Sequence, residues 1–262
     1  MLDGLIPRAA SLVHLAKRGL LAVPVPQSPS RRAAHAAAYW DSAPEEDGQR
    51  WRADSHAKGA VPGWELIGPE HHAYFLDFAR AVDADPRPAR VLEWGAGGGA
   101  NAVAFAPQAE EFIAVEVSPA ALDECRRQVA AVCDTTFTPV LVPVDRPEAA
   151  TEVLPGVVDL FLCFYVIELL PSQQHARRVM QTAATLLRPG GLAVVQAKYQ
   201  TLSPLTRSRT WAYRRGVASM TSFPIDAFWS MAAECGFTPH SVRLVPRNQL
   251  DERYAYYFLV RS

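Results

Sequence analysis

The chain has 262 residues, 49% of them hydrophobic and 20% charged, which is the composition of a folded protein with one α/β domain and some additions. Its formal net charge of −1 offers no basic surface, so we expect no nucleic-acid partner. No apolar run is long enough to span a membrane, and no membrane partner is expected either. The four cysteines show neither a zinc spacing nor a C-x-x-C pair, which indicates free thiols in a cytoplasmic protein and no metal site.

The N-terminal segment combines a short amphipathic pattern with scattered aromatic residues. The leucines of residues 5–21 have helical spacing, and such a helix could pack on the domain, cover a ligand or pair with a second copy in a homodimer. Residues 31–64 are polar and show little periodicity, yet they include Tyr39, Trp40 and Trp51. These rings either pack on the core or close over a ligand, and we predict that they close over a ligand as a lid.

The main domain is expected to begin close to a proline that suits the start of a helix. Pro69 and Glu70 would stand in the first turn of a helix that runs to about Val82. We therefore expect residues 1–65 to form the N-terminal helical lid and residues 66–262 to form the cofactor-binding domain.

Beyond this helix the sequence alternates short apolar runs with amphipathic helical patterns. Two helical stripes, over residues 119–132 and 172–187, separate the runs. Apolar strands separated by amphipathic helices predict a parallel sheet that is covered on both faces. The strands expected in this part are Arg90–Glu93, Phe112–Val117, Pro139–Val144, Val158–Phe164 and Leu192–Ala197.

The C-terminal end breaks this alternation. A helix is expected at Ile225–Cys235, followed by strands at Ser241–Pro246 and Tyr254–Arg261 with no helix between them. Such a hairpin requires an antiparallel strand. The sequence therefore predicts an α/β, Rossmann-like, doubly wound and mostly parallel seven-stranded sheet with an antiparallel last strand, plus the N-terminal helical lid.

The stretch most informative about function follows the first expected strand and runs from Glu93 through Trp94 into glycines at 95, 97, 98 and 99. Gly95 can adopt the positive φ of a tight turn, and Gly97 and Gly99 lack a Cβ that would hold a ligand away from the backbone. Gly95, Gly97 and Ala100 also satisfy the dinucleotide fingerprint, which by itself leaves an NAD-type oxidoreductase open. Glu93 argues against that reading, because its carboxylate would repel a pyrophosphate and attract a cationic, amino-bearing ligand.

With an acid ahead of the glycines, this stretch resembles the first motif of the class I S-adenosylmethionine-dependent methyltransferases. The fourth expected strand and the corner at residues 186–192 also resemble this family, so the resemblance covers about residues 90–197. It implies the predicted fold and S-adenosylmethionine as the cofactor. The residues that would hold the cofactor at this turn are Glu93, Gly95, Ala96, Gly97 and Gly99.

The ends of the next three strands supply the other candidate cofactor residues. Glu116 closes the second strand, where a carboxylate can accept hydrogen bonds from the ribose hydroxyls, and Val117 adjoins it. The resemblance implies that Asp145, after the third strand, accepts the adenine amino group. It also implies that Phe164 and its successors, at the end of the fourth strand, face the transferred methyl.

The candidate catalytic residues are His71, His72 and Tyr165. Methyl transfer to a hydroxyl benefits from a base near neutral pKa, and the family resemblance places the helix before the first strand at the border of the cofactor. Surface positions for the histidines and a wall position for Tyr165 are the alternatives.

We predict an S-adenosylmethionine-dependent methyltransferase that acts on a small-molecule, specialised-metabolite acceptor, with oxygen as the acceptor atom. Residues 200–221 are rich in arginine and aromatic residues, which favours a planar or anionic substrate, although a solvated loop explains them almost as well. An enzyme of the same fold that holds the cofactor but catalyses cyclisation or rearrangement stays open as an alternative.

Overall fold

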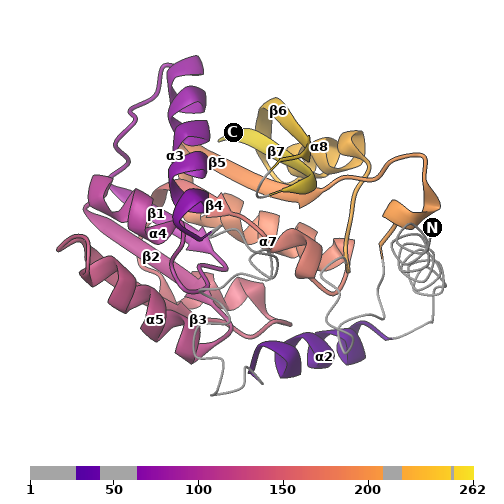
Figure 1. Cartoon of the computed structure of the whole chain (residues 1–262), viewed down its shortest axis with the longest axis horizontal. Coiled ribbons are helices and arrows are strands. Elements are labelled where there is room, and N and C mark those ends of the chain that lie inside the picture. The colour runs from indigo at the N-terminus through magenta and orange to yellow at the C-terminus, as the bar shows by residue number, and fades with distance from the viewer. Residues whose placement is uncertain (1–27, 42–63, 209–219, 249–250) are drawn as a thin grey trace, which may run out of the picture.

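The computed structural model describes residues 28–41, 64–208, 220–248 and 251–262, and a seven-stranded sheet forms their centre (Figure 1). The strands are β1 (Arg90–Trp94), β2 (Glu111–Glu116), β3 (Thr136–Leu141), β4 (Val158–Cys163), β5 (Leu187–Lys198), β6 (Phe237–Arg247) and β7 (Glu252–Arg261).

The strand order is β3-β2-β1-β4-β5-β7-β6. Strands β1 to β5 pair in parallel, whereas β7 is antiparallel to both β5 and β6. The predicted fold, with its antiparallel last strand, is confirmed. Because parallel strands end at the same edge, the residues that follow β1 to β5 meet along one edge, and the chain reverses its direction of winding between β1 and β4.

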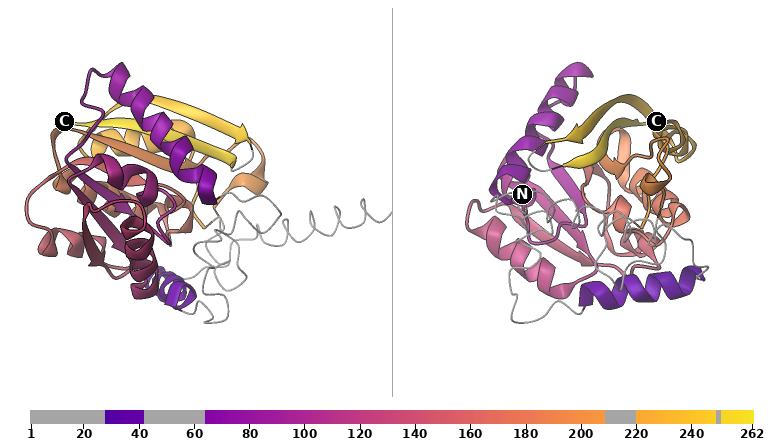
Figure 2. Two further views of the ribbon diagram at one scale, coloured as in Figure 1. Left: turned by 60° about the vertical axis from the view of Figure 1, so that its left-hand side comes forward. Right: turned by 45° about the vertical axis from the view of Figure 1, so that its right-hand side comes forward.

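Helices cover both faces of the sheet (Figures 1 and 2). On one face, α3, α4 and α5 enclose a core that includes Phe75, Phe112 and Tyr256. On the other, α6, α7 and α8 enclose a second core around Phe161 and Phe228. Within the described ranges no helix combines the length and the hydropathy needed to cross a bilayer. The helices are α2 (Pro29–Asp41), α3 (Trp64–Ala81), α4 (Ala102–Phe105), α5 (Pro119–Ala130), α6 (Ala150–Val153), α7 (Gln173–Leu186) and α8 (Ile225–Glu234).

The expectation that residues 31–64 are largely irregular is wrong for their first part, which forms α2. Five alanines between positions 33 and 38 give this segment a high helix propensity, which outweighs the aromatic residues behind it. Ser28 accepts a hydrogen bond from the backbone N–H of Arg31 at 3.2 Å and so caps the helix. Ala33 and Ala36 are buried, so one face of α2 packs against other residues. The helix expected at 5–21, as well as Trp51, lies outside the described residues.

Several boundaries differ from the prediction. β3 lies at residues 136–141 instead of 139–144. It is an edge strand, and its first residues include polar threonines, so the apolar pattern does not reveal its start. Its edge position also explains why the strand tolerates Pro139. α3 begins five residues before Pro69, at Trp64, which keeps the proline in the early part of the helix. The helix after the glycines, α4, has only four residues, so the dipole that we expected to aid ligand binding is small.

Candidate active site

The glycine turn lies directly after β1. The φ angles of Gly95, Gly97 and Gly99 are 76°, 51° and 92°, which only glycine adopts easily. The backbone N–H of Gly95 donates to the carbonyl of Val115 at 2.7 Å and ties the turn to β2. A Cβ on Gly95 would lie 2.1 Å from Cγ2 of Val166, so the residue after Tyr165 rests on this turn.

Gly99 is explained by packing. A Cβ at this position would lie 3.2 Å from Cα of Cys125 on α5, so Gly99 permits the turn to approach that helix. Of the two glycines that we expected to leave room for a ligand, this one has a structural reason of its own. Gly97 donates its backbone N–H to Oε1 of Glu116 at 3.1 Å, which joins the turn to the end of β2.

Glu93, the last but one residue of β1, is 1% exposed. Its Oε1 accepts a hydrogen bond from Nδ2 of Asn101 at 2.7 Å, while its Oε2 is buried without a hydrogen-bond partner among the described residues. Burial, together with the nearby charge of Glu116, raises the pKa of Glu93 to about 8, although the hydrogen bond from Asn101 lowers it. Burial disfavours the ionised form of this carboxyl group, and a cation beside it would stabilise that form.

Glu116 stands at the end of β2, where its carboxylate braces the neighbouring backbone. Its Oε2 accepts the N–H groups of Val117 at 2.5 Å and Ser118 at 3.4 Å, in addition to the Gly97 contact on Oε1. Burial raises the pKa of Glu116, and these backbone hydrogen bonds oppose the shift. Two carboxylates at adjacent strand ends thus flank the glycine turn, as the sequence predicted.

Asp145 lies in the exposed turn that follows β3. Its charge acts on His175, whose pKa is lowered mainly by burial, then by Arg178 and by Arg32, with Asp145 opposing. Because Arg32 belongs to α2, that helix, which lies at the lower side of the view in Figure 1, is near the start of α7 and the turn after β3.

The two candidate histidines have different surroundings. His71 is fully buried, with its ring stacked on that of Phe164 at a centroid distance of 4.1 Å. His72 is half-buried, lies edge-on to Phe105, and has a pKa lowered by burial. Of the two histidines, His71 contacts the rings of Phe164 and Tyr165 after β4, whereas the ring contacts of His72 are with Phe75 and Phe105, away from the rest of the candidate site.

Tyr165 follows β4 with a φ of 58°, a strained value for a residue with a side chain. Its hydroxyl donates to Oδ1 of Asp251 at 2.8 Å, and its backbone N–H donates to Oε1 of Gln196 at 2.7 Å. Asp251 also accepts a hydrogen bond from the hydroxyl of Tyr256 at 2.5 Å. The structure therefore brings together Tyr165, His71 and a buried carboxylate that the sequence did not single out.

The residues that sequence reasoning missed are Asn101, Gln196, Asp251 and Tyr256. Asn101 gave a weak signal as the polar residue among the small residues after the glycines. Asp251 gave none, because it precedes a strand by one position and reads as a turn residue.

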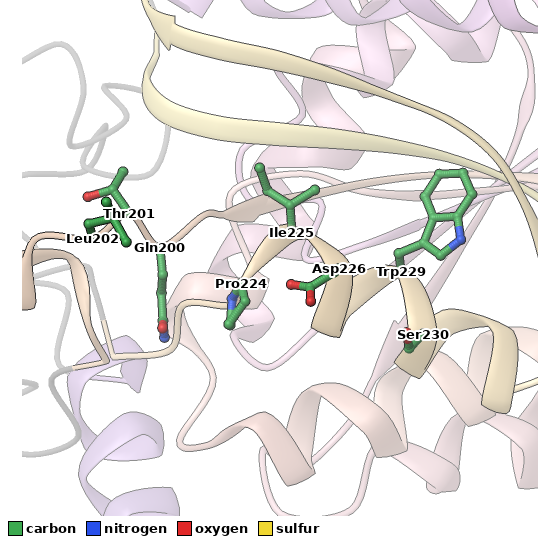
Figure 3. Close-up of a pocket in the computed structure, with 8 residues that line it drawn as sticks. All are labelled: Gln200, Thr201, Leu202, Pro224, Ile225, Asp226, Trp229 and Ser230. Atoms are coloured by element: carbon green, nitrogen blue, oxygen red, sulfur yellow. The ribbon is translucent and has the colours of Figure 1, made fainter.

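A separate cavity of about 730 Å³ opens beyond β5, beside the start of α8 (Figure 3). Ile225 and Trp229 give it an apolar wall, and Asp226 adds one carboxylate. None of the candidate cofactor residues lines it, so it is distinct from the glycine turn.

A family model described as a methyltransferase domain matches residues 69–242, well over half of the chain. The chain belongs to this family. The prediction of a class I S-adenosylmethionine-dependent methyltransferase is confirmed. No curated protein matches the chain in sequence.

Solved methyltransferase structures share the fold at low sequence identity. The magnesium protoporphyrin IX methyltransferase ChlM of Synechocystis PCC 6803, with S-adenosylhomocysteine bound, is 14% identical with a TM-score of 0.63, over 88% of this chain and 100% of that one. The 1,6-didemethyltoxoflavin-N1-methyltransferase of Burkholderia thailandensis is 18% identical with a TM-score of 0.60, over 92% and 93% of the two chains. The N-methyltransferase NodS of Bradyrhizobium japonicum WM9 is 16% identical with a TM-score of 0.58, over 82% and 97%.

Proposed function

We propose that this methyltransferase binds S-adenosylmethionine over the glycine turn, with Glu93 facing the amino group of its methionine part. The observation that carries this proposal is the buried Oε2 of Glu93, which no described residue satisfies. A buried, unpaired carboxylate oxygen is costly, and an ammonium group supplies both a hydrogen bond and the opposite charge. A pyrophosphate at the same place would add a third negative group beside Glu93 and Glu116.

Glu116 is proposed to hold the ribose. A carboxylate can accept about four hydrogen bonds, and three backbone N–H groups already donate to this one, so it has capacity for a ribose hydroxyl. Val117 and Asp145 would complete the adenosine end, with Ala96, Gly97 and Gly99 as the backbone wall. Phe164 would border the methyl-donor end, since the next residues of the chain rest on the glycine turn.

The N-terminal segment is proposed to cover this site. The charge of Arg32 reaches His175 at the start of α7, and Asp145 acts on the same histidine, so α2 lies near the adenosine end. A cover of this kind would exclude water from the sulfonium.

The acceptor is proposed to be a small molecule with a hydroxyl group. A hydroxyl must lose its proton to become a good nucleophile, whereas a neutral amine attacks without prior deprotonation. The hydroxyl of Tyr165 on a buried carboxylate supports this choice, because it offers a route for that proton. The protein is proposed to be cytoplasmic, where cysteines stay reduced, and its four cysteines are free thiols. The predicted homodimer can be tested by measuring the mass of the protein in solution by size-exclusion chromatography.

The test is S-adenosylhomocysteine release from S-adenosylmethionine over a panel of phenols, alcohols, carboxylic acids and amines. We expect turnover with a hydroxyl compound and none with the matched amine. Turnover confined to amines would overturn the choice of oxygen. A changed substrate without S-adenosylhomocysteine release would instead favour cyclisation or rearrangement.

A further inference from the structure

A continuous chain of hydrogen bonds joins the acid of the glycine turn to Tyr165. His71, at its centre, places Nδ1 2.8 Å from Oδ1 of Asn101 and Nε2 2.8 Å from the hydroxyl of Tyr256. Asn101 continues to Glu93, and Tyr256 continues to Asp251. His71 and Asp251 are 0% and 3% exposed, so these two members of the hydrogen-bond network are shielded from water.

Two amide side chains fix the direction of these hydrogen bonds. Gln196 accepts the backbone N–H of Tyr165 through Oε1, so its Nε2 must be the atom that donates to the Tyr256 hydroxyl, at 2.7 Å. Asn101 donates through Nδ2 to Glu93, so its Oδ1 accepts from Nδ1–H of His71. Nδ1 of His71 is therefore protonated.

The single proton of the Tyr256 hydroxyl decides the charge of His71. Gln196 donates to this hydroxyl, so the proton can go only toward Asp251 or His71, and Tyr256 donates it to Oδ2 of Asp251, at 2.5 Å against 2.8 Å to Nε2 of His71. Nε2 of His71 must then donate to the Tyr256 oxygen, because an oxygen that has given its proton away can only accept there. The directions assign a buried imidazolium on His71 and a carboxylate on Asp251, bridged by Tyr256.

We propose that Asp251, held ionised by His71 through Tyr256, takes up the proton of the methyl acceptor by way of Tyr165. The inference rests on the proposed transfer to a hydroxyl, a reaction in which a hydroxyl compound and the sulfonium donor become an ether, a thioether and one proton. As the acceptor oxygen bonds to the methyl carbon, its proton moves to the hydroxyl oxygen of Tyr165, and the Tyr165 proton moves to Oδ1 of Asp251. Tyr165 is then the catalytic residue, and Asp251, Tyr256 and His71 are positioning residues.

The position of Tyr165 supports this role. Its neighbour Val166 contacts Gly95, so the tyrosine stands one residue from the turn that is proposed to hold the cofactor. Its φ of 58° shows that the fold holds this side chain in place against local strain.

Other ionisable groups surround the relay and set its charge balance. Glu93 of β1 is connected to His71 by way of Asn101. The guanidinium of Arg243, on β6, lies 4.1 Å from the ring centre of Tyr74, and the Tyr74 ring lies next to that of His71. The ionisable groups that neighbour the relay include Glu70 and Tyr74 of α3, Lys198 of β5 with Glu168 near it, and Arg243 of β6.

Nitrogen-15 NMR of histidine-labelled protein tests the assigned charges without any acceptor. The ring signals of His71, identified by their loss in His71→Gln, should show two protonated nitrogens at pH 7 in the wild type. Asp251→Asn and Tyr256→Phe should each lower the pH at which the ring loses a proton by at least one unit. Tyr257→Phe, on the opposite face of β7, is the matched control and should change nothing, since its hydroxyl donates to the carbonyl of Ile225. A neutral His71 in the wild type overturns the proposal.

Steady-state kinetics, measured with the hydroxyl acceptor that the substrate panel identifies, test whether Tyr165 and Asp251 take part in the reaction. Tyr165→Phe should lower kcat by about 100-fold, the lower end for acid–base catalysis, with the Kd of S-adenosylhomocysteine unchanged within threefold. The residual rate should rise about tenfold per pH unit as hydroxide replaces the relay, which a merely structural role would not produce. Wild-type kcat in Tyr165→Phe overturns the relay. Wild-type protein that fails to bind S-adenosylhomocysteine overturns the proposed function instead, whatever the charge of His71.

Discussion

Glutamine in place of Glu93 should stabilise the ligand-free protein at alkaline pH. The pKa of this carboxyl in the folded protein is about 8 and its ordinary value is 4.5. Because the folded pKa is the higher one, the folded protein keeps a proton that the unfolded chain releases. This contribution to stability is fully present below pH 4.5 and is lost as the pH rises through about 8.

The size of this effect follows from the two pKa values. Each pH unit between 4.5 and about 8 corresponds to about 1.4 kcal/mol, so the wild type should lose roughly 3–4 kcal/mol relative to Glu93→Gln between pH 5 and pH 8. Glutamine keeps an oxygen for Nδ2 of Asn101 and carries no charge at any pH. The assay is urea unfolding of the ligand-free proteins from pH 5 to pH 9, with Glu110→Gln, at an exposed carboxylate, as control. Parallel stability curves for wild type and Glu93→Gln would refute the reasoning.

The affinity for the cofactor should rise with pH, whereas the stability of the ligand-free protein should fall. The amino group of S-adenosylhomocysteine is proposed to bind the ionised carboxylate, so the wild-type affinity should fall about tenfold for each pH unit below 8. Glu93→Gln should bind more weakly at pH 8 and lose this dependence. Titration calorimetry at several pH values measures both, and a pH-independent wild type would contradict the assignment of Glu93 to the amino group.

Three further variants test separate parts of the site. Glu116→Ala should weaken S-adenosylhomocysteine binding by roughly 1.5–3 kcal/mol, the range for hydrogen bonds to a charged group; an equal loss in Glu111→Ala, at the other end of β2, would argue against a local role. Gly95→Ala should destabilise the fold by roughly 1–3 kcal/mol because its Cβ meets Val166, and Val166→Ala should restore part of the melting temperature; no restoration would show that the contact is not the cause. Ala36→Glu puts a charge on the buried face of α2 and should reduce cofactor affinity more than domain stability; unchanged affinity would mean that α2 does not cover the site.

The fold and the geometry of the glycine turn could be predicted because their signals are local. Glu93 and Glu116 each end an apolar run, and parallel strands bring such ends to one edge of a sheet. The glycines at 95 and 97 mark a turn whose φ angles the structure confirms as positive. The absence of a helix between the last two strands was enough to predict the antiparallel β7.

The hydrogen-bonded network around His71 could not be predicted, because its contacts join distant positions. His71 meets Tyr256 across 185 residues, and Tyr165 meets Asp251 across 86. The sequence suggested His71 and Tyr165 one at a time, but it could not show that they share a carboxylate. His72 looks equivalent to His71 in the sequence, and only the rotation of α3 separates the buried ring from the half-buried one.

Titration calorimetry of the wild-type protein with S-adenosylhomocysteine and, separately, with NADH tests the central claim most directly. The arrangement of Glu93, Glu116 and the glycine turn predicts one S-adenosylhomocysteine per chain and no heat with NADH. Binding of NADH, or no binding of S-adenosylhomocysteine by folded protein at pH 8, would contradict the claim that these carboxylates hold the methyl donor.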